Sequence, residues 1–220
     1  MLVETGAMRR RKLLGISLAL LALGALTVWL NRTELKRWVY EGGGRDAWQK
    51  PDEVMRALAI APGTHVADIG SGGGYFTFRF ARAVGPSGKV YAVDIDEDML
   101  RQLGERAQRE GLTSVETILA EPHDPKLPAG GVDLIFLCNT YHHLDNQTEY
   151  FRRLRGSLRP GGRVAIVELR GEGWLGRLFR HSTRKDVLRS EMEAAGYRLE
   201  QQFDFLRRQH FLIFSAEQTP

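Results

Sequence analysis

Val66–Phe76 reads VADIGSGGGYF, an apolar run that contains one acid and then passes into a turn with four glycines. Glycine lacks a Cβ, so such a turn can be sharp and its backbone can approach a ligand closely. A second apolar run ends in Asp94. The helix expected after the glycines would direct free N–H groups at a ligand, and an acid at the next strand end can bind ribose hydroxyls. This order of features predicts that a nucleoside-bearing molecule lies across the ends of two adjacent parallel strands.

The spacing of the glycines narrows the kind of nucleotide. A dinucleotide-binding turn needs G-x-G-x-x-G. The last of these glycines is replaced by Tyr75 when the pattern starts at Gly70, and by Thr77 when it starts at Gly72. A P-loop fails at Val90, where serine or threonine is required. A cofactor without a pyrophosphate therefore fits better.

Further motifs resemble those of a known family. Asp68–Gly74 resembles the first motif of class I S-adenosylmethionine-dependent methyltransferases, and Tyr141–Leu144 resembles the His-His-Leu stretch of their type 11 branch. Other segments similar to the family, in the family's order, are Val93–Leu100, Ala120–Glu121, Val132–Asn139 and Leu158–Arg163. The resemblance covers roughly residues 46–216 and implies methyl transfer with S-adenosyl-L-methionine as cofactor.

The resemblance also implies a set of cofactor-binding residues, which are Asp68, Gly70, Ser71, Gly72, Asp94, Ile95, Glu121 and Asn139. The glycine turn would run under the methionine part of the cofactor, and Asp68 would balance its ammonium, directly or through water. Asp94 would hold the ribose and Ile95 would pack on the adenine. Glu121 is a candidate acceptor for the adenine amino group, and Asn139 would offer its backbone carbonyl or its side chain. Each of the acids could instead be a surface cap.

Methyl transfer requires few catalytic groups from the protein, because alignment of the sulfonium with the acceptor supplies most of the acceleration. An acceptor hydroxyl would need a base to take its proton. Tyr141, His142 and His143 are weak candidates for catalysis or substrate contact, although similar stretches in the family often look structural. Trp48 could help to cover the site or could belong to the core.

The hydrophobic pattern predicts alternating strands and helices. Strands are expected at residues 65–69, 89–93, 115–119, 132–138, 163–169, 197–206 and 210–216. Helices are expected at 51–60, 75–84, 97–110, 147–158 and 183–195, the last with Thr183 as its cap. The short turn between the last two strands forces them to be antiparallel. The fold class is therefore α/β, a doubly wound, Rossmann-like, seven-stranded and mostly parallel sheet with a C-terminal antiparallel hairpin.

Composition limits the partners of the protein. The chain has 220 residues, of which 43% are hydrophobic and 26% charged, which is typical of one globular domain with an appendage. The net charge of +4 is modest and no basic motif carries interleaved aromatic residues, so nucleic acid is not an expected partner. Cys138 is the only cysteine, which excludes an intrachain disulfide and a cysteine zinc site. We expect no metal and an inert buried thiol.

The N-terminal segment differs from the rest of the chain. Residues 13–30 carry no charge and follow the basic run Arg9–Lys12. As a helix they would span about 27 Å, close to a hydrocarbon core of about 30 Å. A membrane anchor is the favoured interpretation. A cleaved signal peptide, with small residues at Ala22 and Gly24, and a core helix are the alternatives. The expected organisation is a basic region with anchor or signal at 1–31, a linker at 32–45 and a methyltransferase domain at 46–220.

These features lead to a membrane-tethered methyltransferase that acts on a small or lipophilic acceptor. Its domain would face the cytoplasm, because S-adenosylmethionine is made there, unless a cleaved signal peptide exports it. The alternative is a catalytically silent module that binds S-adenosylmethionine or another nucleoside at the membrane. A nicotinamide oxidoreductase is disfavoured by the glycine spacing. Specificity is expected to lie in the N-terminal segment, the loop after the fourth strand and residues 170–182.

Overall fold

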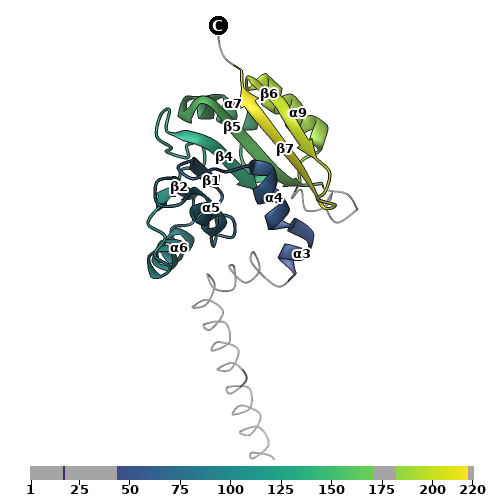
Figure 1. Cartoon of the computed structure of the whole chain (residues 1–220). Helices are drawn as coiled ribbons and strands as arrows, with labels where there is room; N and C mark the ends of the chain where they lie inside the picture. The colour runs from purple at the N-terminus through teal and green to yellow at the C-terminus, as the bar shows by residue number, and fades with distance from the viewer. Residues whose placement is uncertain (1–16, 18–43, 171–181, 218–220) are drawn as a thin grey trace, which may run out of the picture. The chain divides into compact units, whose positions relative to one another are not determined.

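The computed structural model describes residues 44–170 and 182–217, together with residue 17. These residues form an α/β domain around a seven-stranded sheet of order β3-β2-β1-β4-β5-β7-β6 (Figure 1). The strands are β1 (His65–Ile69), β2 (Lys89–Asp94), β3 (Val115–Leu119), β4 (Val132–Cys138), β5 (Leu158–Leu169), β6 (Tyr197–Phe203) and β7 (Gln209–Ala216). The predicted fold class is confirmed.

The strand order places a switch point between β1 and β4. The chain runs outward from β1 through β2 to β3, then returns to the other side of β1 and continues through β4 to β5. All neighbouring pairs among these five strands are parallel, whereas β7 pairs antiparallel with both β5 and β6. Ligands of open α/β sheets bind where the strand order reverses, at the carboxyl ends of the strands. Here that place lies beyond Ile69 and Cys138.

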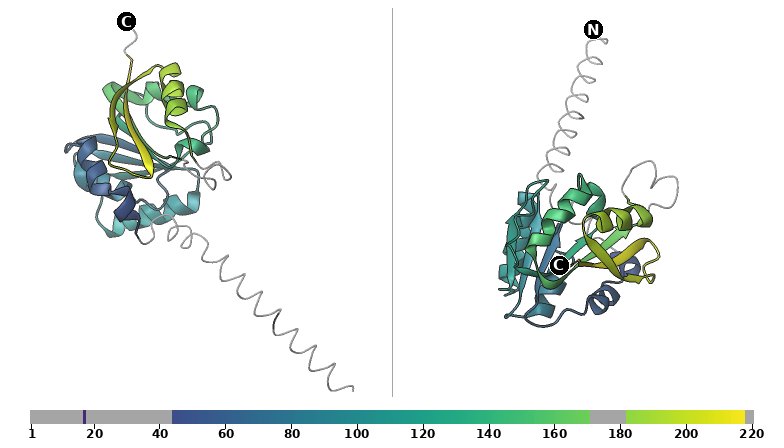
Figure 2. Two further views of the ribbon diagram at one scale, coloured as in Figure 1. Left: turned by 90° about the vertical axis from the view of Figure 1, so that its right-hand side faces the viewer. Right: turned by 90° about the horizontal axis from the view of Figure 1, so that it is seen from above.

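Helices cover both faces of the sheet, as Figure 2 shows. The helical segments are α3 (Arg45–Gln49), α4 (Pro51–Leu58), α5 (Thr77–Val84), α6 (Glu97–Arg109), η1 (Tyr141–His143), α7 (Gln147–Leu154), η2 (Arg155–Ser157) and α9 (Lys185–Ala194). The central strand β4 is apolar on both faces because both are covered. On one face Phe136 packs with its ring centroid 4.8 Å from that of Phe76 and 5.0 Å from that of Phe80. On the other face Ile135 and Leu137 belong to the core that contains α7 and α9.

Two predicted boundaries, the start of β5 and the end of the helix before it, are wrong because β5 contains an irregularity. The strand begins at Leu158 rather than at residue 163, and the preceding helix ends at Leu154 before the short η2. The register of the β4–β5 pair jumps from Leu158 to Arg163, so the intervening residues form an irregularity within one strand. Gly161 has a φ of +78°, which a regular strand does not permit. Residues 159–162 therefore look like a turn in sequence but interrupt a longer strand.

Two further local differences involve helix starts. Helix α9 begins at Lys185, and its N-cap is Arg184 rather than Thr183. The Arg184 guanidinium binds the Asp186 carboxylate in the first turn at 2.7 Å. The sequence predicts no helix at α3, where Arg45 falls in the expected linker and residues 46–49 fall at the start of the expected domain. The short helix ends at Gln49, and Lys50, with a φ of +45°, caps it and turns the chain into α4.

The predicted membrane or signal segment at residues 13–30 lies outside the described residues, apart from Ser17, as does nearly all of the predicted linker. Within residues 44–170 and 182–217 no helix has the length and apolar character needed to cross a bilayer.

Candidate functional site

The glycine turn joins β1 to α5 and lies against the loop after β4. Gly70, Gly72 and Gly74 all have positive φ, at +75°, +52° and +90°. A Cβ on Gly70 would lie 2.2 Å from the Thr140 Oγ1, so only glycine allows this close approach. The Gly70 and Ser71 N–H groups both donate to the Val93 carbonyl, at 2.8 and 3.1 Å. The turn is therefore bound to the ends of β2 and β4 at once.

Asp94, at the end of β2, closes the turn. Its Oδ2 accepts a hydrogen bond from the Gly72 N–H at 2.8 Å, and its Oδ1 accepts one from the Asp96 N–H at 3.0 Å. Asp96 in turn caps α6 by accepting from the Met99 N–H at 3.2 Å. The carboxylate is thus oriented by the backbone on both sides. Each of its oxygens keeps further lone pairs that can accept bonds from a diol.

The residue after Asp94 is an exposed apolar side chain. Ile95 is 65% exposed, which makes it one of three large hydrophobic residues exposed within the described part of the chain. Such a surface, next to the acid expected to bind ribose, suits the face of a planar base. Glu121, which the sequence assigns to the adenine amino group, follows β3 and forms an ion pair with Lys126 at 2.8 Å. The Ala120 N–H donates to the Asp94 carbonyl at 2.9 Å, so this loop borders the site.

Asp68 lies beneath the turn rather than at its surface. Its side chain is buried, and Oδ2 accepts a hydrogen bond from the Thr77 hydroxyl at 2.6 Å. Burial raises the pKa of Asp68 to about 7, because desolvation outweighs the Thr77 hydrogen bond; nearby Asp94 raises the pKa further, whereas Arg45 lowers it. A positive group of a ligand close to Asp68 would favour its ionised form.

Asn139 directly follows β4 in the left-handed conformation, with a φ of +54°, and its N–H donates to the Val167 carbonyl at 2.8 Å. Its side-chain oxygen accepts from Gln209 Nε2 at 2.8 Å. The buried Gln49 side chain donates both to Gln209 at 3.2 Å and to the Cys138 sulfur at 2.8 Å. The Asn139 side chain is thus part of an internal amide chain, which leaves its backbone as the group for a ligand.

Burial raises the pKa of the Cys138 thiol to about 12, so the thiol is protonated at neutral pH.

The three catalytic candidates have different surroundings. Tyr141 is fully buried, stacks on Phe151, and donates its hydroxyl to the Glu191 Oε2 at 2.6 Å. Burial and this hydrogen bond raise the pKa of Tyr141 far above its usual value, so the phenol stays neutral. The His143 ring lies 4.0 Å from the His142 ring, centroid to centroid. Tyr141 therefore belongs to the core, and it forms η1 together with the two histidines, beyond the end of β4.

His142 is paired with an acid that the sequence analysis missed. Its Nδ1 lies 2.6 Å from the Oε1 of Glu168, which is completely buried near the end of β5. The Leu169 N–H also donates to this Oε1, at 3.1 Å. The other oxygen, Oε2, has no hydrogen-bond partner among the described residues. A carboxylate held by one oxygen can accept a hydrogen bond or a proton with the other. An acid at the end of an apolar strand, the signal that pointed to Asp94, could have identified it.

The predicted cofactor residues therefore fall into two groups. Those from β1 and β2 meet at the carboxyl ends of these strands and are Asp68, Gly70, Ser71, Gly72, Asp94 and Ile95. Asn139 borders them through its neighbour Thr140, whereas Glu121 is turned toward Lys126. The Ser71 hydroxyl is buried and has no hydrogen-bond partner among the described residues. This orphaned polar atom, an oriented acid and an exposed apolar surface fit a nucleoside ligand.

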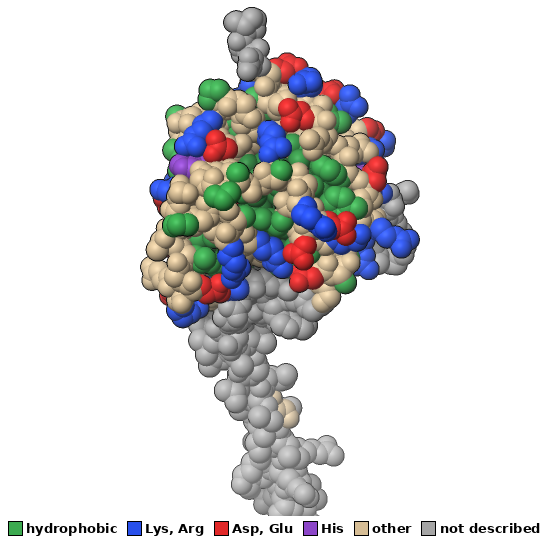
Figure 3. All heavy atoms as spheres, in the orientation of Figure 1, with side chains coloured by type: hydrophobic (Ala, Val, Ile, Leu, Met, Phe, Trp, Pro, Cys, Tyr) green, Lys and Arg blue, Asp and Glu red, His purple; other side chains and the backbone are tan. Residues whose placement is uncertain are grey.

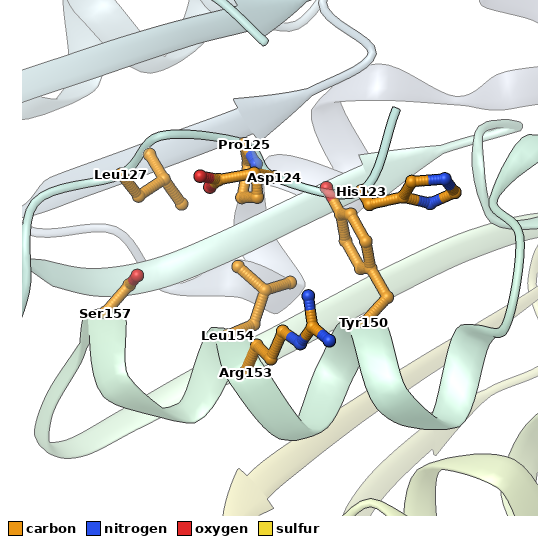
Figure 4. A pocket seen from close by; sticks show the side chains of 8 residues that line it. All are labelled: His123, Asp124, Pro125, Leu127, Tyr150, Arg153, Leu154 and Ser157. Atoms are coloured by element: carbon orange, nitrogen blue, oxygen red, sulfur yellow. The ribbon is translucent and has the colours of Figure 1, made fainter. Parts of the chain in front are cut away.

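A separate pocket of about 270 Å³ lies between α7 and the loop after β3 (Figure 4). It is lined by His123, Asp124, Pro125, Leu127, Tyr150, Arg153, Leu154 and Ser157. None of the predicted cofactor residues lines it.

On the face shown in Figure 3, acidic and basic side chains are interspersed around a hydrophobic centre, and neither sign of charge forms a patch of its own.

The fold and this site define an α/β protein that binds a nucleoside-bearing cofactor at the switch point of its sheet. Residues 66–162 match a family model described as a methyltransferase domain. A solved S-adenosylmethionine-dependent methyltransferase from Aquifex aeolicus is 25% identical, with a TM-score of 0.71 over 77% of this chain and 91% of that one. Residues 66–162 are therefore similar to a methyltransferase domain, and the fold is that of an S-adenosylmethionine-dependent methyltransferase.

Curated relatives match a smaller part of the chain. A ubiquinone/menaquinone biosynthesis C-methyltransferase of Ectopseudomonas mendocina is 27% identical over 64% of this chain and 54% of its own length. A nocamycin O-methyltransferase of Saccharothrix syringae is 33% identical over 48% of this chain and 38% of its own length. The chain spans between 33% and 56% of the length of the curated relatives that it matches. The [4+2]-cyclase SpnF shares the fold at 14% identity, with a TM-score of 0.65 over 78% of this chain and 82% of its own.

The raised pKa of Asp68 predicts a pH dependence of cofactor binding. Below about pH 7 Asp68 is protonated in the empty protein, and a bound ammonium group favours its ionised form. Binding of S-adenosylhomocysteine must then release a proton, so affinity should fall as pH decreases below 7, by up to about tenfold per unit. Calorimetric titrations between about pH 5.5 and 8.5 measure this slope. Asp68→Asn should flatten it, and an unchanged slope in that variant would contradict the assignment.

Proposed function

We propose that this protein transfers the methyl group of S-adenosylmethionine to a small or lipophilic acceptor. The observation that carries the proposal is the glycine turn closed by Asp94, in which Gly72 N–H and Asp96 N–H both orient one carboxylate at 2.8 and 3.0 Å. This arrangement lies within the segment that matches the methyltransferase family. The cofactor supplies an activated methyl group on its sulfonium, and the residues of the protein bind and align it.

Each part of the site has a proposed role in holding the cofactor. Asp94 accepts hydrogen bonds from the ribose hydroxyls, and the exposed face of Ile95 packs on the adenine. The buried Ser71 hydroxyl supplies a further polar contact beside them. Asp68, beneath the turn, provides negative charge opposite the ammonium. Because these groups are held by the backbone and by the core, the site is oriented before the cofactor binds.

The class of acceptor is suggested by the names of two relatives. One is named for ubiquinone and menaquinone biosynthesis and the other for O-methylation of nocamycin. Both names suit a lipophilic or small organic acceptor. Residues 13–30 carry no charge, which supports tethering of the domain at a membrane, where a lipophilic acceptor would be concentrated. We place the domain on the cytoplasmic side, where the cofactor is made.

The buried acid at the end of β5 has a proposed role in proton transfer. If the acceptor reacts through a hydroxyl, its O–H bond breaks as the methyl–oxygen bond forms, and a base must take the proton. The Glu168 Oε2 is without a hydrogen-bond partner among the described residues, and His142 holds the other oxygen of this carboxylate at 2.6 Å. We propose that Glu168 takes the proton and that His142 holds the Glu168 carboxylate in position.

A catalytically silent module that binds the cofactor at the membrane is the second candidate. One observation favours it: the fold is similar to that of the [4+2]-cyclase SpnF. This similarity shows that the fold does not by itself define methyl transfer. Binding of S-adenosylhomocysteine without any transfer of label to acceptors would support it.

Binding of S-adenosylhomocysteine to the full-length protein tests the site. Asp94→Asn removes one acceptor for the ribose and for a backbone N–H, so affinity should fall about tenfold or more, as measured by calorimetry. Asp98→Asn is the matched control, because Asp98 lies in the first turn of α6, where its half-buried side chain forms an ion pair with Arg101 at 3.4 Å. Equal affinities of the two variants would count against the site.

Transfer of labelled methyl from S-adenosylmethionine to simple phenols and hydroquinones tests the role of Glu168. Glu168→Gln should reduce the turnover rate at least about 100-fold, as expected for loss of a general base. Its affinity for S-adenosylhomocysteine should stay near that of the wild-type protein. An active Glu168→Gln variant, with the same pH profile as the wild type, would rule out this role.

Membrane tethering predicts that the full-length protein sediments with membranes and resists extraction at alkaline pH. Leu20→Arg places a charge at the centre of the apolar segment and should weaken insertion by about 3 kcal/mol, so that more protein is extracted. Mass spectrometry of the N-terminus distinguishes an anchor from a signal peptide. A soluble full-length chain, or one cleaved after the apolar segment, would refute the tether.

A further inference from the structure

We propose that the pocket between α7 and the loop after β3 is a second ligand site, which binds a small apolar amine and is coupled to the cofactor site. The pocket has a volume of about 270 Å³, and none of the predicted cofactor residues lines it. The amine site itself does not depend on methyl transfer. Its coupling rests on the proposed function, because it requires a cofactor held at Asp94.

A nearly buried tyrosine opens onto this pocket. Tyr150 is 6% exposed, and its hydroxyl forms no hydrogen bond with any described residue. Figure 4 shows the Tyr150 ring extending from α7, with the hydroxyl directed at the loop that carries His123 and Asp124. Burial raises the pKa of Tyr150, and the nearby charge of Asp124 raises it further. Because buried tyrosine hydroxyls usually have a hydrogen-bond partner, a ligand in the pocket would supply the one that the protein lacks here.

The loop wall of the pocket carries a carboxylate without a cation. Asp124 forms no ion pair within the part of the chain that the structure describes, and its Oδ1 accepts a hydrogen bond from the Lys126 N–H at 2.8 Å. The neighbouring cations are paired with other acids, Lys126 with Glu121 at 2.8 Å and Arg153 with Glu149 at 2.9 Å. The pocket therefore has an uncompensated negative charge, which a cationic ligand would balance.

The size and the remaining walls of the pocket limit the body of this ligand. Pro125 and Leu154 are buried and Leu127 is half-buried, so these walls are apolar. A volume of 270 Å³ lies just below the range of about 300–1,000 Å³ that drug-sized ligands occupy, which suits a molecule with a single ring. Its ammonium would pair with the Asp124 carboxylate, and its ring would pack on these apolar side chains and on the Tyr150 ring.

The same loop is joined through its backbone to the acid that closes the glycine turn. The Glu121 and Asp124 N–H groups donate to each other's carbonyls at 2.9 and 3.1 Å, and the Ala120 N–H donates to the Asp94 carbonyl at 2.9 Å. An amine paired with Asp124 would hold this loop in the position that borders Asp94. The amine and the cofactor then raise each other's affinity by the same factor.

The test compares three ligands of similar size and different charge. Calorimetry on the full-length protein would measure 2-phenylethylamine, the neutral 2-phenylethanol and the anionic phenylacetate. The amine should bind with a dissociation constant of about 1 mM or lower, within the limits for a molecule of this size. The alcohol and the carboxylate should bind at least about tenfold more weakly.

Two variants identify the groups that hold the amine. Asp124→Asn, which can still accept the Lys126 N–H, should weaken amine binding about tenfold or more. Asp186→Asn is the matched control, because Asp186 is an exposed acid in the first turn of α9 that pairs with Arg184 at 2.7 Å. Tyr150→Phe should weaken amine binding about two- to tenfold and leave the melting temperature unchanged or higher, because the lost hydroxyl has no partner in the described chain.

The coupling is measured by titrating S-adenosylhomocysteine with and without saturating 2-phenylethylamine. The amine should raise the affinity for S-adenosylhomocysteine about fivefold or more in the wild-type protein, and should have no effect in Asp124→Asn. An unchanged affinity in the wild-type protein would overturn the coupling. A protein that binds the amine but not S-adenosylhomocysteine would overturn the proposed function and the coupling together, while the amine site would stand.

Three results would overturn the amine site itself. Tighter binding of phenylacetate than of the amine would show that the Arg153 charge, rather than that of Asp124, selects the ligand. Equal amine affinities of Asp124→Asn and the wild-type protein would place the amine elsewhere. A marked fall in the melting temperature of Tyr150→Phe would show that the hydroxyl is satisfied within the protein.

Discussion

The close approach of Gly70 to Thr140 is the constraint on which the site depends. A side chain on Gly70 would collide with the threonine hydroxyl at 2.2 Å, so the ends of β1 and β4 could not meet as they do. With the loops in contact, the turn also reaches the Val93 carbonyl and the Asp94 carboxylate on β2. One missing Cβ therefore brings three strand ends together. The cofactor site, the loop with the two histidines and the docked helix α3 are all arranged around that point.

Buried polar groups near the strand ends give the site its chemistry. Asp68, Glu168 and the Ser71 hydroxyl are all buried, and the last two keep an atom without a hydrogen-bond partner among the described residues. Such groups destabilise a fold unless something else satisfies them. A cofactor and an acceptor with complementary charges and donors would do so. The stability lost in the empty protein is then recovered on binding, which is the usual relation between a strained site and its ligand.

The sheet was largely predictable because each of its central strands is an uninterrupted apolar run between turn residues. Strands β1, β3 and β4 have the predicted bounds, and the antiparallel terminal hairpin is present. The failures are local. Residues 159–162 look like a turn, yet the register jump lets the chain remain in β5 on both sides of them. Helix α3 has only five residues, and its stability comes from contacts with Tyr75 and Gln209 that are remote in sequence.

The sequence by itself determined the fold class, the glycine turn proposed to receive the cofactor and the acid that closes this turn, because these depend on local patterns of glycine, apolar residues and strand-end acids. Only the tertiary structure decided which groups meet. It showed that Asp68 is buried, that Tyr141 belongs to the core, and that His142 pairs with Glu168, which lies 26 residues away. It also placed Arg45 beside the glycine turn. Such pairings follow from strand order and from the packing of helices, which bring together residues that no local pattern connects.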